Sequence, residues 1–190
     1  MTSRYNNLTT HVIGISETQI CDVDDVLRQI KRLAKEKGVI FQLVDANKVT
    51  GKEHLELASY HAKKAFQQNS QISNSIEIEI LLYATGQRQI DKALTLIGIT
   101  PKTKNVAVVA LFSPAKTTNL SELFQKIASL LEGNQSKTVF NVTPEKEKDL
   151  IQLYDITSEE LKTGSIHDLI TERMGMLELT KRPPTEILKR

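Results

Sequence analysis

The side chains best suited to chemistry lie in a short polar turn, residues 85–89, between two apolar segments. Gly86 allows the chain to turn there, and Gln87, Arg88 and Gln89 follow it directly. An arginine guanidinium pairs with phosphate and lies against bases, whereas glutamine amides can both donate and accept at base edges. The turn therefore indicates a site for phosphates, nucleobases or the carbonyl groups of a partner protein.

A short helix is predicted on either side of this turn. Residues 76–80 alternate apolar and acidic side chains, a pattern that also fits a half-buried strand. The apolar run over residues 81–84 breaks the alternation, and Gly86 stands where a glycine commonly ends a helix. We therefore predict one helix over residues 76–84 and a second over residues 91–97.

The preceding helix, predicted over residues 52–68, offers further polar groups. His54 and His61 lie at the edge of its stripe of small apolar residues, while Lys63 and Lys64 lie on more exposed faces. We predict that His61, Lys63 and Lys64 flank the polar turn. The alternative is that the histidines only contact solvent along the side of the helix.

The two histidines do not predict a metal site. Seven residues along a helix separate two imidazoles by about 10 Å, because each residue rises about 1.5 Å. This separation is too large for one zinc ion to bind both. The single cysteine, Cys21, can supply neither a metal cage nor an internal disulfide. No metal or other cofactor is expected.

Motifs that carry catalysis are missing from the sequence. It contains no glycine-rich phosphate loop, no serine elbow and no kinase signature. The acidic pairs at residues 24–25 and 159–160 stand at predicted helix starts, where negative charge stabilises the helix dipole. We therefore predict that the chain alone is not an enzyme. The alternative is a small enzyme that binds a phosphorylated metabolite at the polar turn.

Composition and charge limit the class of partner. The chain has 190 residues, of which 25 are Lys or Arg and 23 are Asp or Glu, so its net charge is only +2. Proteins that bind duplex nucleic acid over a wide surface usually carry a marked basic excess, so any nucleic-acid contact should be local. No apolar run approaches about 18 residues, the length of a membrane-spanning helix, so no membrane contact is expected.

Strands and helices alternate along the chain and predict an α/β protein, with α+β as the alternative. We expect a single domain over residues 1–190, with loose ends at about residues 1–7 and 181–190. Its centre should be one small mixed β-sheet covered by several helices. Strands are expected over residues 8–16, 39–44 and 106–112, with a possible short edge strand over 137–142. The strand over residues 106–112 is the most apolar and should be central in the sheet. Further helices are expected over residues 21–38, 119–133, 143–154, 157–164 and 165–179.

The last predicted helix carries a wider apolar arc than a surface helix needs. Ile170, Met174 and Leu177 belong to this arc, which also contains Arg173. Burial in the core explains part of the arc, but methionines and a guanidinium equally suit a protein interface.

Four stretches of the chain resemble one known family. They are HLELASYHAKKAF (54–66), NSIEIEILLYATGQRQI (74–90), DKALTLIGI (91–99) and ITERMGMLEL (170–179). From about residue 11 to residue 179 the chain resembles the small kinase-binding, tRNA-recruiting subunit of the KEOPS complex, the family of the PRPK-binding protein. The most specific part of the resemblance runs over residues 54–98.

The resemblance implies a non-catalytic subunit of the assembly that places threonylcarbamoyl on an adenosine of the tRNA anticodon loop. The implied partners are the atypical kinase of KEOPS, the single-stranded 3′ CCA end of tRNA and, indirectly, the rest of the complex. A scaffold that binds the kinase without touching RNA is the alternative. The expected location is the cytoplasm, and also the nucleus if the source is a eukaryote.

Residue assignments follow from the resemblance and the polar turn together. The kinase interface is assigned to Ile170, Arg173, Met174 and Leu177. The tRNA end is placed at Gln87, Arg88 and Gln89, flanked by His61, Lys63 and Lys64.

Overall fold

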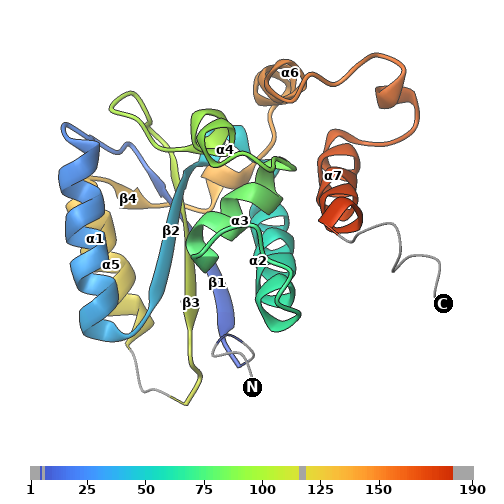
Figure 1. The fold of residues 1–190 in the computed structure, drawn as a ribbon. Helices are drawn as coiled ribbons and strands as arrows, with labels where there is room; N and C mark the ends of the chain where they lie inside the picture. The colour runs from blue at the N-terminus through green and yellow to red at the C-terminus, as the bar shows by residue number, and fades with distance from the viewer. Residues whose placement is uncertain (1–4, 6, 116–118, 182–190) are drawn as a thin grey trace.

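The computed structural model describes residue 5 and residues 7–115 and 119–181, which form one sheet with helices on both faces (Figure 1). The elements follow in the order β1 (Thr9–Ser16), α1 (Val23–Lys37), β2 (Ile40–Asp45), η1 (Ala46–Lys48), α2 (Lys52–Gln67), α3 (Ile76–Thr85), α4 (Ile90–Ile97), β3 (Val106–Phe112), α5 (Leu120–Leu130), β4 (Asn134–Gln135), η2 (Thr138–Phe140), α6 (Pro144–Leu153), η3 (Glu160–Lys162) and α7 (Ile166–Lys181). The elements labelled η are short 3₁₀ helices.

β3 lies inside the sheet, as its continuous apolar sequence predicted. The strand order is β2-β3-β1-β4, and Val109 of β3 lies between Val12 of β1 and Gln42 of β2. The predicted class, a single sheet covered by helices, is confirmed. The sheet is not mixed in direction, however, because every pairing is antiparallel. β1 and β2 run the same way, and β3 is inserted between them in the opposite direction.

Each face of the sheet supports its own hydrophobic core. Successive residues of a strand point to opposite faces, so Val109 packs on one side of the sheet and Val108 on the other. α1 and α5 cover the face of Val108, whereas α2 and α3 cover the face of Val109 (Figure 1). α3 is apolar on nearly all sides because α2, α4 and α7 pack around it.

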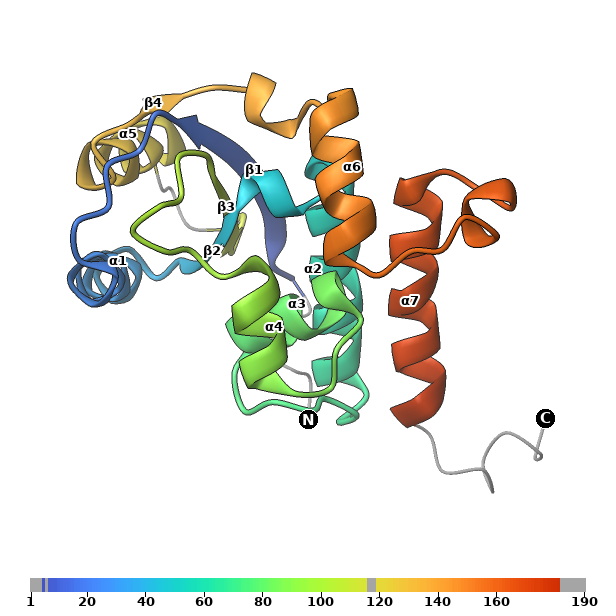
Figure 2. The ribbon, with the colours of Figure 1, turned by 90° about the horizontal axis from the view of Figure 1, so that it is seen from above.

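α7 forms an outer layer beside α2 and α3, with α6 also against it (Figure 2). Within the described residues, no helix combines the length and the apolar character that crossing a bilayer would require.

Local capping explains why most predicted helix ends agree with the structure. The carboxylate of Asp22 accepts a hydrogen bond from the backbone N–H of Asp25 at 3.0 Å, which starts α1. Gly38 ends the same helix in the left-handed conformation, with φ at 64°. The choice of helix rather than strand for residues 76–84 is confirmed, with Ser75 as the capping residue.

The edge strand expected over residues 137–142 is wrong. β4 instead covers Asn134–Gln135, and the chain then turns into η2. The backbone N–H groups of Phe140 and Asn141 bond to carbonyls three residues earlier, so they are not available to a neighbouring strand. The helix expected over residues 157–164 is likewise only the short η3.

One residue of the supposedly loose N-terminal segment is part of the core. Tyr5 is buried, and its ring packs edge-on against Phe66 of α2 with centroids 4.8 Å apart. The remainder of the predicted loose ends lies almost wholly outside the described residues.

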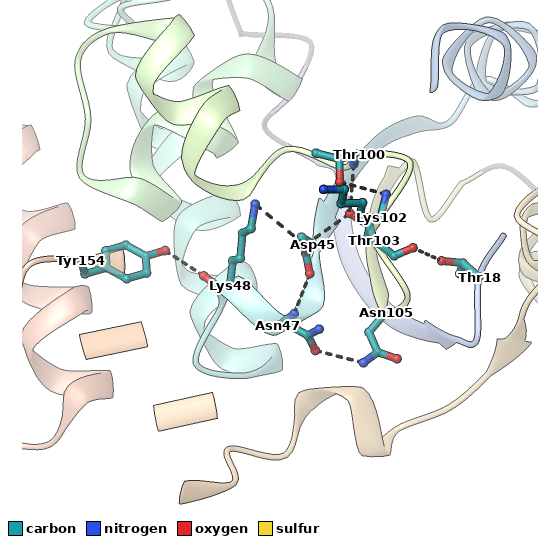
Figure 3. A network of polar contacts seen from close by, with 9 residues as sticks. All are labelled: Thr18, Asp45, Asn47, Lys48, Thr100, Lys102, Thr103, Asn105 and Tyr154. Carbon is teal, nitrogen blue, oxygen red and sulfur yellow. Dashed lines mark hydrogen bonds and ion pairs between the residues drawn. The ribbon is translucent and has the colours of Figure 1, made fainter. Parts of the chain in front are cut away.

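A buried polar network ties the loops at one end of the sheet together (Figure 3). The carboxylate of Asp45 accepts hydrogen bonds from the backbone N–H of Asn47 at 3.0 Å and from the hydroxyl of Thr103 at 3.3 Å. Burial is the largest influence on this carboxylate and raises the pKa of Asp45. The hydroxyl of Thr18 donates to the carbonyl of Thr103 at 2.8 Å. The connection that leaves α4 is thereby fixed to β2 and to the end of β1.

Candidate functional site

The polar turn between α3 and α4 is built by a glycine in a conformation that other residues rarely adopt. Gly86 has φ at 63°, and its N–H donates to the carbonyl of Tyr83. The N–H of Gln87 reaches back to the carbonyl of Leu82 at 3.0 Å. These two bonds form the Schellman motif, which satisfies the free carbonyls at the end of α3. The backbone of the turn is thus held in one conformation before any ligand arrives.

α7 packs against the turn at Gly86. A Cβ added to Gly86 would lie 2.9 Å from the Cβ of Arg173, so only glycine allows this approach. The guanidinium of Arg173 donates to the carbonyl of Tyr154 at the end of α6 and pairs with Glu160 at 3.3 Å. Arg173 therefore joins α7 to the segment between α6 and η3, while its backbone packs on the turn.

The side chains that follow Gly86 face outward. Arg88 and Gln89 are exposed, and Gln87 is half-buried. Gln89 occupies the N-cap position of α4, but its side chain makes no capping hydrogen bond, in contrast to Ser75 of α3. The first N–H groups of α4 therefore lack a side-chain cap, which favours an anion nearby. The three side chains predicted for RNA binding are presented together on this turn.

A shallow pocket of about 430 Å³ opens beside the turn. Gln87 lines it from the turn, and α4 contributes the rest of the wall with Asp91, Lys92, Thr95 and Leu96. The α4 residues were not among the sequence-predicted site residues. Their signal in the sequence is the spacing of Asp91 and Thr95, four residues apart, which places two residues of a helix on one face.

His54 is buried rather than placed at the edge of its helix. Its Nε2 lies 2.8 Å from the carbonyl of Ala84, and its Nδ1 accepts the backbone N–H of Thr50 at 3.2 Å. Nε2 must therefore carry the proton in the neutral ring. Burial lowers the pKa of His54 to about 4, although the bond to Ala84 acts in the opposite direction. His54 thus joins the start of α2 to the end of α3, directly before the turn.

His61 and Lys64 bind α7 rather than the turn. The Nδ1 of His61 lies 2.9 Å from one carboxylate oxygen of Glu178, and the Nζ of Lys64 lies 2.7 Å from the other. The imidazole of His61 also stacks on the ring of Tyr83, with centroids 5.2 Å apart. Partial burial raises the pKa of Glu178, but the hydrogen bonds from Lys64 and His61 outweigh it and lower the pKa overall. These groups clamp α7 onto α2.

Lys63 binds the beginning of β1 and not the turn. Its Nζ donates to the carbonyl of Leu8 at 3.1 Å and to the hydroxyl of Thr10 at 3.0 Å, at the beginning of β1. Burial lowers the pKa of Lys63. Nδ1 of His61 and the Nζ atoms of Lys63 and Lys64 are therefore bound by α7 and by the start of β1, and the turn itself is the exposed part of the predicted RNA site.

The predicted kinase-docking arc is mostly interior to the chain. Ile170, Met174 and Leu177 are 1%, 0% and 4% exposed and belong to the core shared with α3. Arg173 is bound to Tyr154 and Glu160. Ile170, Met174 and Leu177, which were assigned to the kinase interface, therefore pack on the chain's own helices and present little surface to a partner.

A different face of α7 is open. Met176 and Leu179 are 56% and 58% exposed, and they lie three residues apart on one side of the last turns. On the neighbouring helix α2, Tyr60 is equally exposed at 56%. The sequence contained both α7 residues, but the apolar pattern could not show which residues face solvent.

Among the described residues, no group of three or more His, Cys, Asp or Glu side chains could hold a metal ion. On α2, both ring nitrogens of His54 are already occupied, by Thr50 and Ala84.

Two comparisons with known proteins relate the chain to others. Residues 18–178 match the model of a family described as kinase binding protein CGI-121. The regulatory protein Cgi121 of Methanocaldococcus jannaschii is 28% identical over 144 residues, which cover 76% of this chain and 87% of that relative. The matched region includes the polar turn, its pocket and most of α7.

Proposed function

Because this chain belongs to the CGI-121 family of kinase-binding proteins, we propose that it is the non-catalytic subunit of KEOPS that docks on the atypical kinase and binds the 3′ CCA end of tRNA. The role in RNA binding depends on one observation above all. A rigid turn presents Arg88 between two glutamines beside the uncapped start of α4.

The chemistry of this turn suits a few unpaired nucleotides. A guanidinium can pair with a phosphate and lie against a base, and amides can bind base edges. Exposed N–H groups at a helix start add a further position for a phosphate. The net charge of +2 fits such a local contact and does not fit a wide duplex-binding face.

A regulatory role without catalysis fits the same features. The matched relative is named a regulatory protein. The sequence holds no nucleotide-binding loop and no activated nucleophile beside the turn. We expect the isolated chain to form no modified adenosine when it is incubated with ATP, bicarbonate, threonine and tRNA. The proposal places the protein in the cytoplasm, and also in the nucleus if its source is a eukaryote.

The kinase is assigned to the exposed face of α7. Met176 and Leu179 are large apolar side chains that the chain leaves in solvent, next to the clamp formed by Glu178 and Lys64. Methionine and aromatic residues are enriched at protein interfaces, and the neighbouring helix α2 also carries an exposed aromatic residue, Tyr60.

Binding of labelled tRNA to the full chain tests the proposal. Intact tRNA is compared with the same tRNA lacking its last three nucleotides, at one fixed salt concentration, because electrostatic affinity varies steeply with salt. We expect clear binding of intact tRNA and a strong loss on trimming. Equal affinity for the two forms would place the contact on the tRNA body. No binding of either form, with retained binding of the kinase, would leave a kinase-binding scaffold.

A further inference from the structure

The pocket beside the polar turn combines hydrogen-bonding groups with an apolar wall. Its lining residues are Gln87, Asp91, Lys92, Thr95 and Leu96, and its volume is about 430 Å³. Small-ligand sites usually occupy about 300–1,000 Å³, so the pocket is of a size to take one planar group with part of its attachment. Leu96 supplies an apolar surface for such a group, and the other four residues can contact its edge.

The polar side chains that line this pocket differ in whether they can donate or accept hydrogen bonds. The hydroxyl of Thr95 already donates its proton to the backbone carbonyl of Asp91 at 2.8 Å, so its oxygen can only accept a further bond. The ionised carboxylate of Asp91 also only accepts. Lys92 only donates, and the amide of Gln87 can do either. The pocket therefore offers two adjacent acceptors one helical turn apart, with donors beside them.

We propose that this pocket reads the identity of an unpaired base and that Asp91 is the residue that selects it. The inference rests on the proposed binding of the tRNA end at the turn. Cytosine and adenine each carry an exocyclic amino group beside a ring nitrogen that accepts hydrogen bonds. The side-chain oxygens of Asp91 and Thr95 can accept hydrogen bonds from the amino group. Lys92 or the amide of Gln87 can donate a hydrogen bond to the ring nitrogen.

Uracil does not fit the same arrangement. It presents a carbonyl oxygen where cytosine presents its amino group, and this oxygen would face the carboxylate of Asp91 with no proton between them. A site that hydrogen-bonds its proper ligand, and is left with unpaired polar groups when the wrong ligand covers it, rejects that ligand more strongly than an apolar site does. Every base of a CCA end carries an exocyclic amino group, so the pocket favours this end over a run of uridines.

A purely structural role for Asp91 makes a different prediction. An acidic residue in the first turn of a helix stabilises the helix dipole by itself. Asp24 has this position in α1 and is exposed, as Asp91 is, but it lies on a different helix that covers the opposite face of the sheet. Asp24→Asn is therefore the matched control for Asp91→Asn, since both changes remove one first-turn charge.

The experiment measures binding of the full chain to three tRNAs that differ only in their last nucleotides, ending in CCA, ending in UUU or trimmed by three. We expect the wild type to bind the CCA form at least about fivefold more tightly than the UUU form, the lower range for one good base contact. Asp91→Asn should bring this ratio close to one, because an amide can turn its N–H₂ toward the uracil carbonyl. Asp24→Asn should keep the wild-type ratio.

Three results would overturn the inference: a ratio near one in the wild type, an unchanged ratio in Asp91→Asn, or an equal fall in Asp24→Asn. None of these three results contradicts the proposed binding of the tRNA end, provided that removal of the last three nucleotides still abolishes binding. Failure of the proposed function itself is a separate result, since trimmed tRNA would then bind the wild type as well as the intact forms do. Circular dichroism melting of both variants checks that the fold is retained.

Discussion

Gly86 and Arg173 approach so closely that the last turn of α3 and the middle of α7 leave no room for a side chain between them. A Cβ at residue 86 would lie 2.9 Å from the Cβ of Arg173 and 3.5 Å from its carbonyl oxygen. The backbone of Gly86 is also left-handed, with φ at 63°. The turn that carries Arg88 is therefore set by two independent requirements for glycine.

Gly86→Ala should destabilise the protein by about 1–3 kcal/mol. The left-handed conformation alone costs about 1–2 kcal/mol for a residue with a Cβ, and the contact with α7 adds to it. Urea unfolding measures the change. The control is Gly175→Ala in α7, where a Cβ would meet nothing within 4 Å. That change should stabilise the protein by about 0.5–1 kcal/mol, since alanine is a better helix former. Equal effects at the two positions would contradict this account.

Stability should fall as the pH drops from about 6.5 toward 4 because of His54. The ring is neutral in the folded protein, with a pKa of about 4, whereas its ordinary value is 6.5. In this window the unfolded chain binds the proton and the folded chain does not, so protonation favours unfolding. The loss for this group amounts to up to about 3 kcal/mol.

Urea unfolding at several pH values checks the His54 prediction. His54→Gln should weaken the dependence of the unfolding free energy on pH between pH 6.5 and 4. An NMR titration in which the His54 ring takes up its proton near pH 6.5 in the folded protein would show the prediction to be wrong.

Arg88→Ala should weaken binding of intact tRNA by about five- to tenfold or more, the effect of losing one charged or stacking contact to RNA. The melting temperature should stay nearly constant, because exposed charges contribute only about 0–1 kcal/mol to stability. Filter binding measures the affinity, and Arg28→Ala on α1 is the matched control, since Arg28 is also exposed. If the loss is as large for trimmed tRNA, Arg88 contacts the tRNA body instead.

Met176→Arg and Leu179→Arg should each reduce co-purification with the kinase while the chain stays folded. Both side chains are more than half exposed, so a charge there is tolerated by the chain but not by an apolar interface. Leu27→Arg, at an exposed leucine of α1, should leave the kinase bound. Met174→Arg should instead unfold the chain, because that position is fully buried. Full kinase binding by both surface variants would move the interface to another face.

The sequence by itself determined most of the helices, the three long strands and the turn. Capping residues act within one helical turn, so Asp22, Gly38 and Gly86 marked the helix ends without knowledge of the fold. The apolar run of β3 was sufficient to place that strand inside the sheet, because only a strand covered on both faces needs it. The polar residues of the turn were recognisable because no apolar face accounts for them.

Only the tertiary structure decided which faces remain open. An apolar arc on α7 has the same sequence whether it packs on α3 or on another protein, so the burial of Met174 and the exposure of Met176 depend on where the helix docks. The partners of His54 and His61 lie 30 and 117 residues away along the chain. The purely antiparallel pairing of the sheet, too, depends on the insertion of β3 between β1 and β2. Contacts between distant residues set these features, and local sequence patterns do not encode them.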